Sequence, residues 1–417
     1  MNIQQLLQSF PCTCGHEHRC AIERVEIGRG AIGALTQLCR TARSVLVLSD
    51  ENTFAAAGGQ TMAALAGKEI LPVTFGGDKL VVPDEQAVAA MEPWLSRADA
   101  IVAIGAGVMQ DLGKYGASLQ HIPCHIVATA PSMDGYASTG AAMIMGGMKV
   151  TYPVAVPTSI LADTAVLKDA PMELIRAGYG DIVGKFSALN DWKLSHAVKG
   201  EYFCQKVYDL MAEALQKTLT LAEGLVARDE EAVGALMEAL VLAGIAMAFA
   251  GTSRPASGSE HHLSHYFEVT GLMRQKPYFP HGIDVAYSTV VTAQIRQKLL
   301  SAPFPRAAAA FDRADWEENL RRVYGSAADG YTQLQDKVGH YAADRLETYL
   351  EKEAEIRAIL AEVPAPEEIE GMLRAVGFDM AEFYALYDQQ TRRDAVLYAK
   401  DIKDRYTVLW MYWDLLR

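Results

Sequence analysis

The 417-residue sequence lacks several features that mark secreted, membrane-inserted or nucleic-acid-binding proteins. No apolar segment follows its first ten residues, so we expect no secretion signal. Its most apolar run, residues 236–250, is shorter than the ~20 residues of a membrane span and contains Glu238, so we expect a buried helix and no membrane insertion. Acidic residues outnumber basic ones by 51 to 38, and the net charge of -13 argues against a nucleic-acid partner. We therefore expect a cytoplasmic protein.

Cysteine is also scarce, with six residues in the chain. Cys39, Cys124 and Cys204 are scattered in apolar patterns, as buried thiols would be, and do not suggest disulfides. The other three lie in the segment PCTCGHEHRC at residues 11–20, together with two histidines. This segment could hold a structural zinc ion, although its spacing is not that of a standard zinc finger. A mobile start of the chain is the alternative.

Strand and helix patterns alternate through the first third of the chain. Short runs rich in Val and Ile, ending in Gly or polar residues, predict buried parallel strands at residues 44–49, 69–75, 100–105 and 125–130. Helical spacing separates them. This alternation predicts a doubly wound α/β sheet, which binds ligands beyond the carboxyl ends of its strands.

The pattern changes after a loop-like passage from Ser132 to Ala162. Strand signals nearly vanish, and Ala-, Leu- and Glu-rich helical stretches follow, among them residues 201–228, 230–250, 344–363 and 406–416. We therefore predict an α/β dinucleotide-binding domain at residues 1–162 and an all-helical metal and substrate domain at residues 163–417. The aromatic tail with Trp410 and Trp413 suits either an oligomer contact or the core.

A glycine pair, Gly105 and Gly107, ends the predicted strand at residues 100–105. Such glycines let the backbone approach a pyrophosphate, and the next helix offers free N–H groups and its positive dipole end. The third glycine of the dinucleotide fingerprint is missing, so a tight structural turn explains the pair at least as well. 

Two other strand ends carry polar groups that suit a nucleotide. Thr129 and Ser132 offer hydroxyl groups after one strand, and Asp50, after another, could accept from ribose hydroxyls. Capping of the following helix is an equal alternative for Asp50.

Four of the ten histidines lie close together in the sequence. His261, His262 and His265 follow a Ser/Gly-rich turn, and His281 opens the segment HGIDV. Two histidines and one carboxylate can bind a metal ion with a position left open for catalysis, and Asp181, in a run of small residues, is the best carboxylate candidate. His261 and His265 share a helix face because they are four residues apart, whereas His262 lies on another. The alternatives to metal binding are that these histidines cap a helix, form hydrogen bonds in the core or face solvent.

Five segments resemble the glycerol-1-phosphate dehydrogenases of bacteria and archaea, within the superfamily of iron-containing alcohol dehydrogenases and dehydroquinate synthase. They are GAGVMQDLGK, TAPSMDGYAS, AGYGDIVGKFSALNDWKL, SRPASGSEHHLSH and HGIDV, in this order between Gly105 and Val285. The resemblance implies an α/β N-terminal doubly wound nucleotide-binding domain and an all-helical C-terminal metal-binding domain, the dehydroquinate synthase-like fold. It also implies a homo-oligomer, a dimer or larger.

The resemblance implies roles for the matching residues. Asp181, His261 and His281 would bind one divalent metal ion, with zinc first and nickel or iron as alternatives. Asp134, Asp181 and His265 would contact the substrate, with Asp181 and His265 as catalytic residues. The site for NAD or NADP would be formed by Asp50, Gly105, Ala106, Gly107, Val108, Met109, Asp111, Lys114, Thr129, Ser132 and Ser138.

The implied reaction is the reversible reduction of dihydroxyacetone phosphate to sn-glycerol 1-phosphate by NAD(P)H. The proton would come from His265 or from a metal-bound water. Because a phosphorylated substrate needs local positive charge, we add Lys185 and Arg254 as substrate-binding cations, although an ion pair is the stronger alternative for both. A dehydrogenase acting on another polyol or ketose phosphate, and a non-catalytic binding protein of the same fold, are the alternative functions.

The sequence departs from the family in a few places. HGIDV has Ile283 and Asp284 where relatives carry a polar or acidic pair, which leaves the finer substrate or oligomer contacts open. Met109 and Gln110 replace more polar residues and leave the choice between NAD and NADP open. Past about Ser301 no motif matches.

Overall fold

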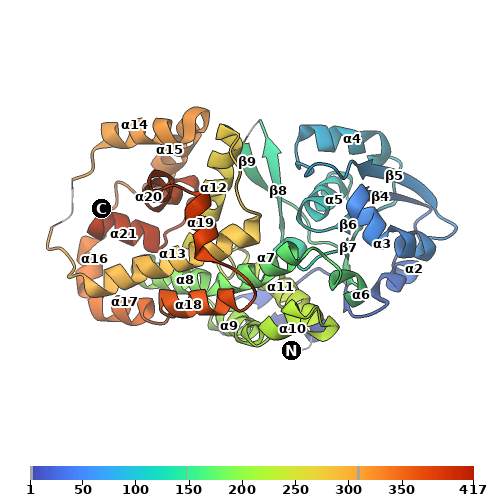
Figure 1. Cartoon of the computed structure of the whole chain (residues 1–417), viewed down its shortest axis with the longest axis horizontal. Helices are drawn as coiled ribbons and strands as arrows, with labels where there is room; N and C mark the ends of the chain where they lie inside the picture. The colour runs from blue at the N-terminus through green and yellow to red at the C-terminus, as the bar shows by residue number, and fades with distance from the viewer. Residues whose placement is uncertain (1–2, 147, 308–309) are drawn as a thin grey trace. The chain divides into compact units, whose positions relative to one another are not determined.

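The computed structural model describes residues 3–146, 148–307 and 310–417, and the chain forms two compact units (Figure 1). Unit 1 consists of Met1–Ile182 and Gln216–Thr252, and unit 2 consists of Val183–Leu215 and Ser253–Arg417. Neither unit is continuous in sequence. The division into domains at residues 1–162 and 163–417 stays a prediction.

Unit 1 is built on a six-stranded parallel sheet with the strand order β3-β10-β7-β6-β4-β5. Four of these strands lie where the Val- and Ile-rich runs predict them. The strands are β3 (Arg24–Ile27), β4 (Ser44–Asp50), β5 (Glu69–Phe75), β6 (Ala100–Gly105), β7 (Cys124–Ala128) and β10 (Ser159–Ala162). The predicted fold class, an α/β nucleotide-binding part and a helical part of the dehydroquinate synthase-like type, is confirmed.

The central strands are covered on both faces, which explains their continuous apolar sequence. Val47, Val102, Ile104 and Val127 are buried in one apolar core, and each such side chain contributes about 1.5–3 kcal/mol when fully buried. Helices α3 (Glu51–Ala64), α4 (Glu85–Leu95) and α5 (Gly107–Gln120) pack beside these strands. The carboxyl ends of β4, β6 and β7 are therefore held in register in one rigid sheet.

The prediction of a loop-like passage from Ser132 to Ala162 is wrong. This passage contains an antiparallel hairpin, β8 (Gly140–Met145) with β9 (Met148–Pro153), and then β10. Each of these strands has only four to six residues, too few for a clear apolar pattern. Their position is fixed by pairing, since β10 lies between β3 and β7.

Helix α11 (Glu230–Ala250) belongs to unit 1 and contains the apolar run at residues 236–250. Among the described residues it is the one helix long and apolar enough to cross a membrane, but 83% of its apolar window is buried inside the protein. It is therefore a core helix, as predicted. The shorter elements of unit 1 are α1 (Ile3–Leu6), β1 (Phe10–Pro11), β2 (Glu17–His18), α2 (Leu35–Leu38), α6 (Thr164–Leu167) and α10 (Ala222–Val226).

The described residues of unit 2 form helices joined by loops and no β-strand. The predicted helix at 201–228 is instead two helices, because the helical stretch is interrupted after Leu219. Trp410 is fully buried, so the aromatic tail lies in the core. The helices are α8 (Lys185–Lys199), α12 (Ser259–Arg274), α13 (His281–Ser301), α14 (Arg313–Tyr324), α15 (Ala328–Val338), α16 (Leu346–Glu351), α17 (Glu353–Leu360), α18 (Pro366–Arg374), α19 (Met380–Leu386), α20 (Gln389–Tyr398) and α21 (Val408–Leu416). Two further helices, α7 (Met172–Val183) and α9 (Gln205–Leu219), continue from one unit into the other.

Candidate functional site

The glycine loop follows β6 directly and begins α5, as predicted. Gly105 has a φ of 155°, which L side chains rarely adopt, and a Cβ there would lie 2.6 Å from the side chain of Met109. Ala106 occupies the N-cap position of α5 and supplies no side-chain cap, so the first N–H groups of this 14-residue helix keep their donor capacity. The Thr129 N–H donates to the Gly105 carbonyl at 3.3 Å, which joins the ends of β6 and β7. The structure thus places Gly105–Met109 beside Thr129, in a form that suits an anionic phosphate.

Lys114 performs a structural task inside this region. Its side chain is completely buried, and its ammonium donates to the Gly135 carbonyl at 2.9 Å, the Gly140 carbonyl at 2.6 Å and the Ser138 hydroxyl at 3.2 Å. Asp111 lies 3.3 Å away as its counter-ion. Burial lowers the pKa of Lys114, and Asp111 partly offsets this effect. Because an ammonium has three donors, these contacts use them all, and Lys114 holds the loop that carries Ser138.

Asp50 caps α3 in the structure. Its Oδ1 accepts from the Thr53 N–H at 2.8 Å, and the Thr53 hydroxyl accepts in return from the Asp50 N–H at 3.0 Å. This is a capping box, the alternative that the sequence left equal to a ribose contact. The carboxylate nevertheless stays at the carboxyl end of β4 and is partly exposed.

Asp181 and Asp134 come together within unit 1. Asp181 is fully buried in the last turn of α7, and its Oδ2 accepts from the Asp134 N–H at 2.9 Å. The approach depends on Gly178, because a Cβ at that position would lie 1.8 Å from the carbonyl oxygen of Pro131. Small residues before Asp181 therefore let α7 pack tightly on the segment that contains Asp134.

Three histidines gather in unit 2 as the sequence predicts. His261 and His265 lie on α12, and His281 is the first residue of α13. Their ring centroids are 5.0 Å apart for His261 and His281, 5.4 Å for His265 and His281, and 6.0 Å for His261 and His265. The ligand nitrogens of His261 and His281 lie within 4.8 Å of each other. His262, on another face, is completely buried and stays outside this group.

The Nδ1 atoms of two of these rings face polar groups of unit 2. His261 Nδ1 lies 2.7 Å from Glu260 Oε1, and His281 Nδ1 lies 3.3 Å from the Ser264 hydroxyl. An imidazole whose Nδ1 donates to such a partner has its Nε2 lone pair available for a metal ion. This arrangement suits the proposed ligand role of both rings.

Glu260 is a residue that the sequence reasoning missed. It is fully buried, and its Oε1 also accepts from the Gly258 N–H at 2.8 Å. Burial raises its pKa, and the Gly258 bond opposes this effect. The signal for it was present in the sequence, since Glu260 immediately precedes His261 and metal-binding histidines usually have a carboxylate or carbonyl partner.

A buried ion pair fixes the start of α12. Arg296 donates to Asp191 Oδ1 at 2.8 Å, and the Ser259 N–H donates to Asp191 Oδ2 at 2.6 Å. Gly258 is required here because a Cβ would lie 2.7 Å from the same carboxylate. The network therefore sets the position of the helix turn that carries His261.

The two added cations are engaged within unit 2. Lys185 is fully buried and donates to the Ala256 carbonyl at 2.9 Å. Arg254 is 2% exposed and forms a two-bond ion pair with Glu201, with a further bond to the Tyr406 carbonyl at 2.8 Å. Arg254 thus forms the ion pair that the sequence analysis gave as the alternative to substrate binding.

Asp284, one of the departures from the family pattern, has its own partner. It is fully buried, and the Tyr387 hydroxyl donates to its two carboxylate oxygens at 2.9 and 3.0 Å. Burial raises the pKa of Asp284 well above its usual value. The departure thus belongs to the packing between α13 and Tyr387.

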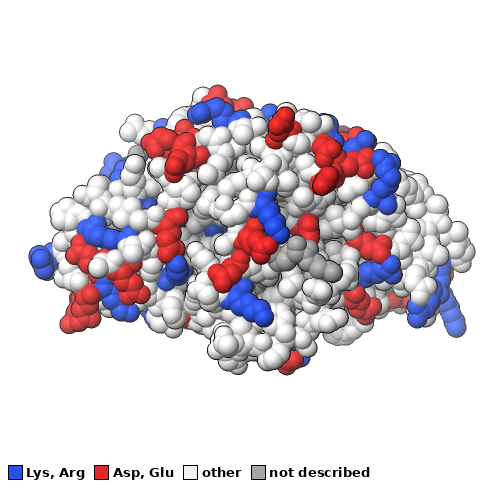
Figure 2. Space-filling model, turned by 90° about the horizontal axis from the view of Figure 1, so that it is seen from below, with Lys and Arg blue, Asp and Glu red and all other residues white. Residues whose placement is uncertain are grey.

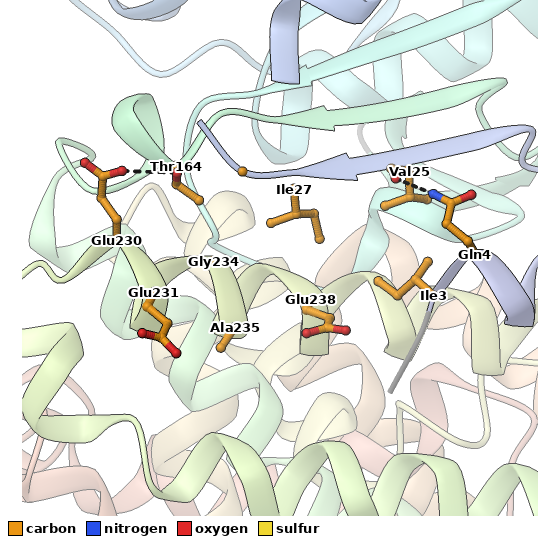
Figure 3. A pocket seen from close by; sticks show the side chains of 11 residues that line it. Ile3, Gln4, Val25, Ile27, Thr164, Glu230, Glu231, Gly234, Ala235 and Glu238 are labelled. Atoms are coloured by element: carbon orange, nitrogen blue, oxygen red, sulfur yellow. Dashed lines mark hydrogen bonds between the residues drawn. The ribbon is translucent and has the colours of Figure 1, made fainter. Parts of the chain in front are cut away.

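A pocket of about 690 Å³ in unit 1 does not include any of the predicted site residues (Figure 3). It lies between β3 and α11, and Glu230, Glu231 and Glu238 line it. Carboxylates disfavour a phosphorylated ligand, so this pocket does not suit the predicted substrate. On the face of the molecule in Figure 2, acidic and basic side chains are interspersed over a largely uncharged surface.

Comparison with known proteins agrees with these features. The family model for iron-containing alcohol dehydrogenases matches residues 26–171. Solved structures share the fold, such as sulfoacetaldehyde reductase from Bifidobacterium kashiwanohense in complex with NAD+, at a TM-score of 0.61 and 13% identity, covering 95% of this chain and 97% of that one. The chain therefore belongs to the class of metal-containing, NAD(P)-dependent alcohol dehydrogenases.

Closer relatives narrow the class. A glycerol-1-phosphate dehydrogenase [NAD(P)+] from Geobacillus thermodenitrificans is 31% identical over 402 residues, which cover 94% of this chain and 91% of the relative. One from Geobacillus stearothermophilus is 31% identical over 97% of this chain and 96% of the relative. The chain belongs to the glycerol-1-phosphate dehydrogenase family, and the predicted resemblance is confirmed.

Proposed function

We propose that this protein is a metal-dependent enzyme that interconverts dihydroxyacetone phosphate and sn-glycerol 1-phosphate with NAD(P)(H). The observation that carries the proposal is the histidine cluster of α12 and α13, with His261 and His281 oriented through their Nδ1 atoms, in a chain whose relatives bear that activity in their names. We place the enzyme in the cytoplasm, as a dimer or larger homo-oligomer.

Asp181, His261 and His281 would hold one divalent ion. Together they offer one carboxylate oxygen and two imidazole nitrogens, and this donor set suits zinc first, then nickel or iron(II). Three protein ligands leave a position open, and an ion bound there supplies Lewis-acid polarisation of a carbonyl oxygen.

The remaining residues bind, orient and move protons. The Gly105 loop and the N–H groups at the start of α5 would hold the cofactor pyrophosphate, with Thr129, Ser132 and Ser138 beside it. Asp134, whose N–H is bonded to Asp181, would position the substrate hydroxyl groups. His265 would hold or deliver the proton that the alcohol oxygen gains.

The substrate class is tested by comparing turnover of dihydroxyacetone phosphate with that of dihydroxyacetone, following NADH and NADPH oxidation. We expect the phosphorylated ketone to be preferred by at least about 100-fold, since charge-assisted phosphate contacts contribute several kcal/mol. Preference for the free ketone would refute the assignment and favour a polyol dehydrogenase.

The metal role is tested with Asp181→Asn, in which a neutral amide replaces the anionic ligand. We expect loss of bound metal at this site and a fall in kcat of about 100-fold or more. The matched control is Asp169→Asn, at an exposed position, which should keep both metal and activity. Unchanged metal content and turnover in Asp181→Asn would contradict the proposal.

A further inference from the structure

The N-terminal hairpin brings two thiols and one imidazole together inside unit 1. Cys12 follows β1, the Cys12 N–H donates to the His16 carbonyl at 3.1 Å, and Gly15 supplies the left-handed turn with a φ of 87°. As a result, the ligand atoms of Cys12, Cys14 and His18 all lie within 4.8 Å of one another. None of these side chains serves the proposed dehydrogenase chemistry.

His18 is oriented as a metal ligand. Its ring is fully buried, and its Nδ1 lies 2.9 Å from the Phe249 carbonyl, so that Nδ1 carries the proton and Nε2 the lone pair. The rings of Phe10 and Phe249 pack against it at 5.3 and 5.5 Å. A backbone carbonyl behind a histidine is a common second partner of metal-bound imidazole.

The Nε2 of His18 lies 3.4 Å from the Sγ of Cys14. Two ligands of one tetrahedral zinc ion, with Zn–S of about 2.3 Å and Zn–N of about 2.0 Å, are about 3.5 Å apart. A simple thiol–imidazole hydrogen bond also has this length, so the distance alone does not decide. The second thiol of the group, that of Cys12, favours the metal site, because one hydrogen bond needs no more than one thiol.

Cys12, Cys14 and His18 offer two thiolates and one imidazole, which are three of the four ligands of a tetrahedral zinc ion. We propose that Cys12, Cys14 and His18 bind a zinc ion, separate from the Asp181, His261 and His281 site. Cys20, which the sequence groups with the other two cysteines, is absent from the group.

The zinc ion would stabilise a segment with little other support. Strands β1 and β2 have two residues each, and an isolated hairpin of this size is not stable in water. Zinc binding adds free energy to the folded state and requires deprotonated thiols, so we expect retention of the ion at neutral pH and release in acid.

X-ray absorption at the zinc edge, measured on the purified full-length protein, tests the proposal. Sulfur ligands can come only from the cysteine group, because the other proposed site has oxygen and nitrogen donors alone. We expect about one sulfur-coordinated zinc per chain in the wild type and in Asp181→Asn. Failure of the dehydrogenase proposal would leave this result intact. A wild type without sulfur-bound metal, or with a Cys12–Cys14 disulfide, would overturn the zinc site.

Serine variants then assign the ligands. Cys12→Ser and Cys14→Ser should each lower zinc retention against a chelator by at least about 10-fold, because each removes one thiolate. The matched control is Cys20→Ser, a buried neighbour in the same segment that should retain zinc fully. Full zinc retention in Cys12→Ser or in Cys14→Ser would overturn the proposed ligand set.

Discussion

The residues proposed for dehydrogenase chemistry are held by different means in the two units. Unit 1 contributes close approaches of the main chain, which depend on Gly105 and Gly178. Unit 2 contributes imidazole rings, whose orientation depends on side-chain partners such as Glu260 behind His261. Close packing of the backbone is disrupted when one methyl group is added, whereas a set of side-chain ligands is disrupted when one donor is removed. The two kinds of damage should therefore be separable, one seen first in stability and the other in metal binding and turnover.

The largest effect on turnover is expected for the histidine cluster of unit 2, in His261→Ala. Loss of one of the three proposed metal ligands should lower kcat by roughly 1,000-fold, with the melting temperature of the metal-free protein nearly unchanged. Metal content and kcat, measured on the same preparation, test this. His121→Asn is the control, since it replaces an exposed histidine at a left-handed position that Asn tolerates. Equal activity in the two variants would remove His261 from the site.

Gly178→Ala tests the close backbone packing in unit 1. A Cβ at this position would lie 1.8 Å from the Pro131 carbonyl oxygen, a backbone atom that cannot rotate away. We expect the free energy of unfolding to fall by about 3 kcal/mol or more, measured by urea denaturation. Gly59→Ala is the matched control, because Gly59 lies in α3 with nothing within 4 Å and Ala there should be neutral or stabilising by up to about 1 kcal/mol.

The sequence predicts the side-chain half of the site better than the backbone half. His261, His265 and His281 can be read as a cluster because imidazole has a narrow range of uses and the spacing places two of them on one helix face. The bond between the Asp134 N–H and Asp181 joins residues 47 apart, and no local pattern encodes such a contact. 

The strands of the sheet also differ in whether a local sequence pattern or a long-range contact defines them. Strands β4, β5, β6 and β7 could be predicted because apolar residues run along their length. β10 has four residues, and only its pairing with β3 and β7 makes it a strand. Lys114 shows the limit for single residues. The family resemblance assigns it to the cofactor site, but no local pattern shows that its buried ammonium makes three hydrogen bonds that hold the loop around Ser138.

Glu260→Ala should have an intermediate effect. It leaves all three proposed metal ligands in place but removes the acceptor behind His261 Nδ1, and such losses typically cost 10- to 100-fold in metal affinity or activity. Glu260→Gln should restore part of this, since its amide oxygen can still accept from Nδ1. Competition with a chelator measures the affinity. If Glu260→Ala lost stability without any change in metal affinity, the carboxylate would have only a packing role.

The smallest effect on catalysis is expected for Arg254→Lys, which asks whether this cation serves substrate or structure. The guanidinium is 2% exposed and makes two bonds to Glu201, a geometry that a lysine ammonium cannot reproduce. We expect the KM for dihydroxyacetone phosphate to change by less than about 2-fold, while the free energy of unfolding falls by roughly 1–3 kcal/mol because Glu201 keeps a weaker partner. Steady-state kinetics and urea denaturation separate these outcomes. A KM raised more than about 10-fold at unchanged stability would instead make Arg254 a phosphate ligand, and unit 2 would then supply substrate charge as well as the imidazoles.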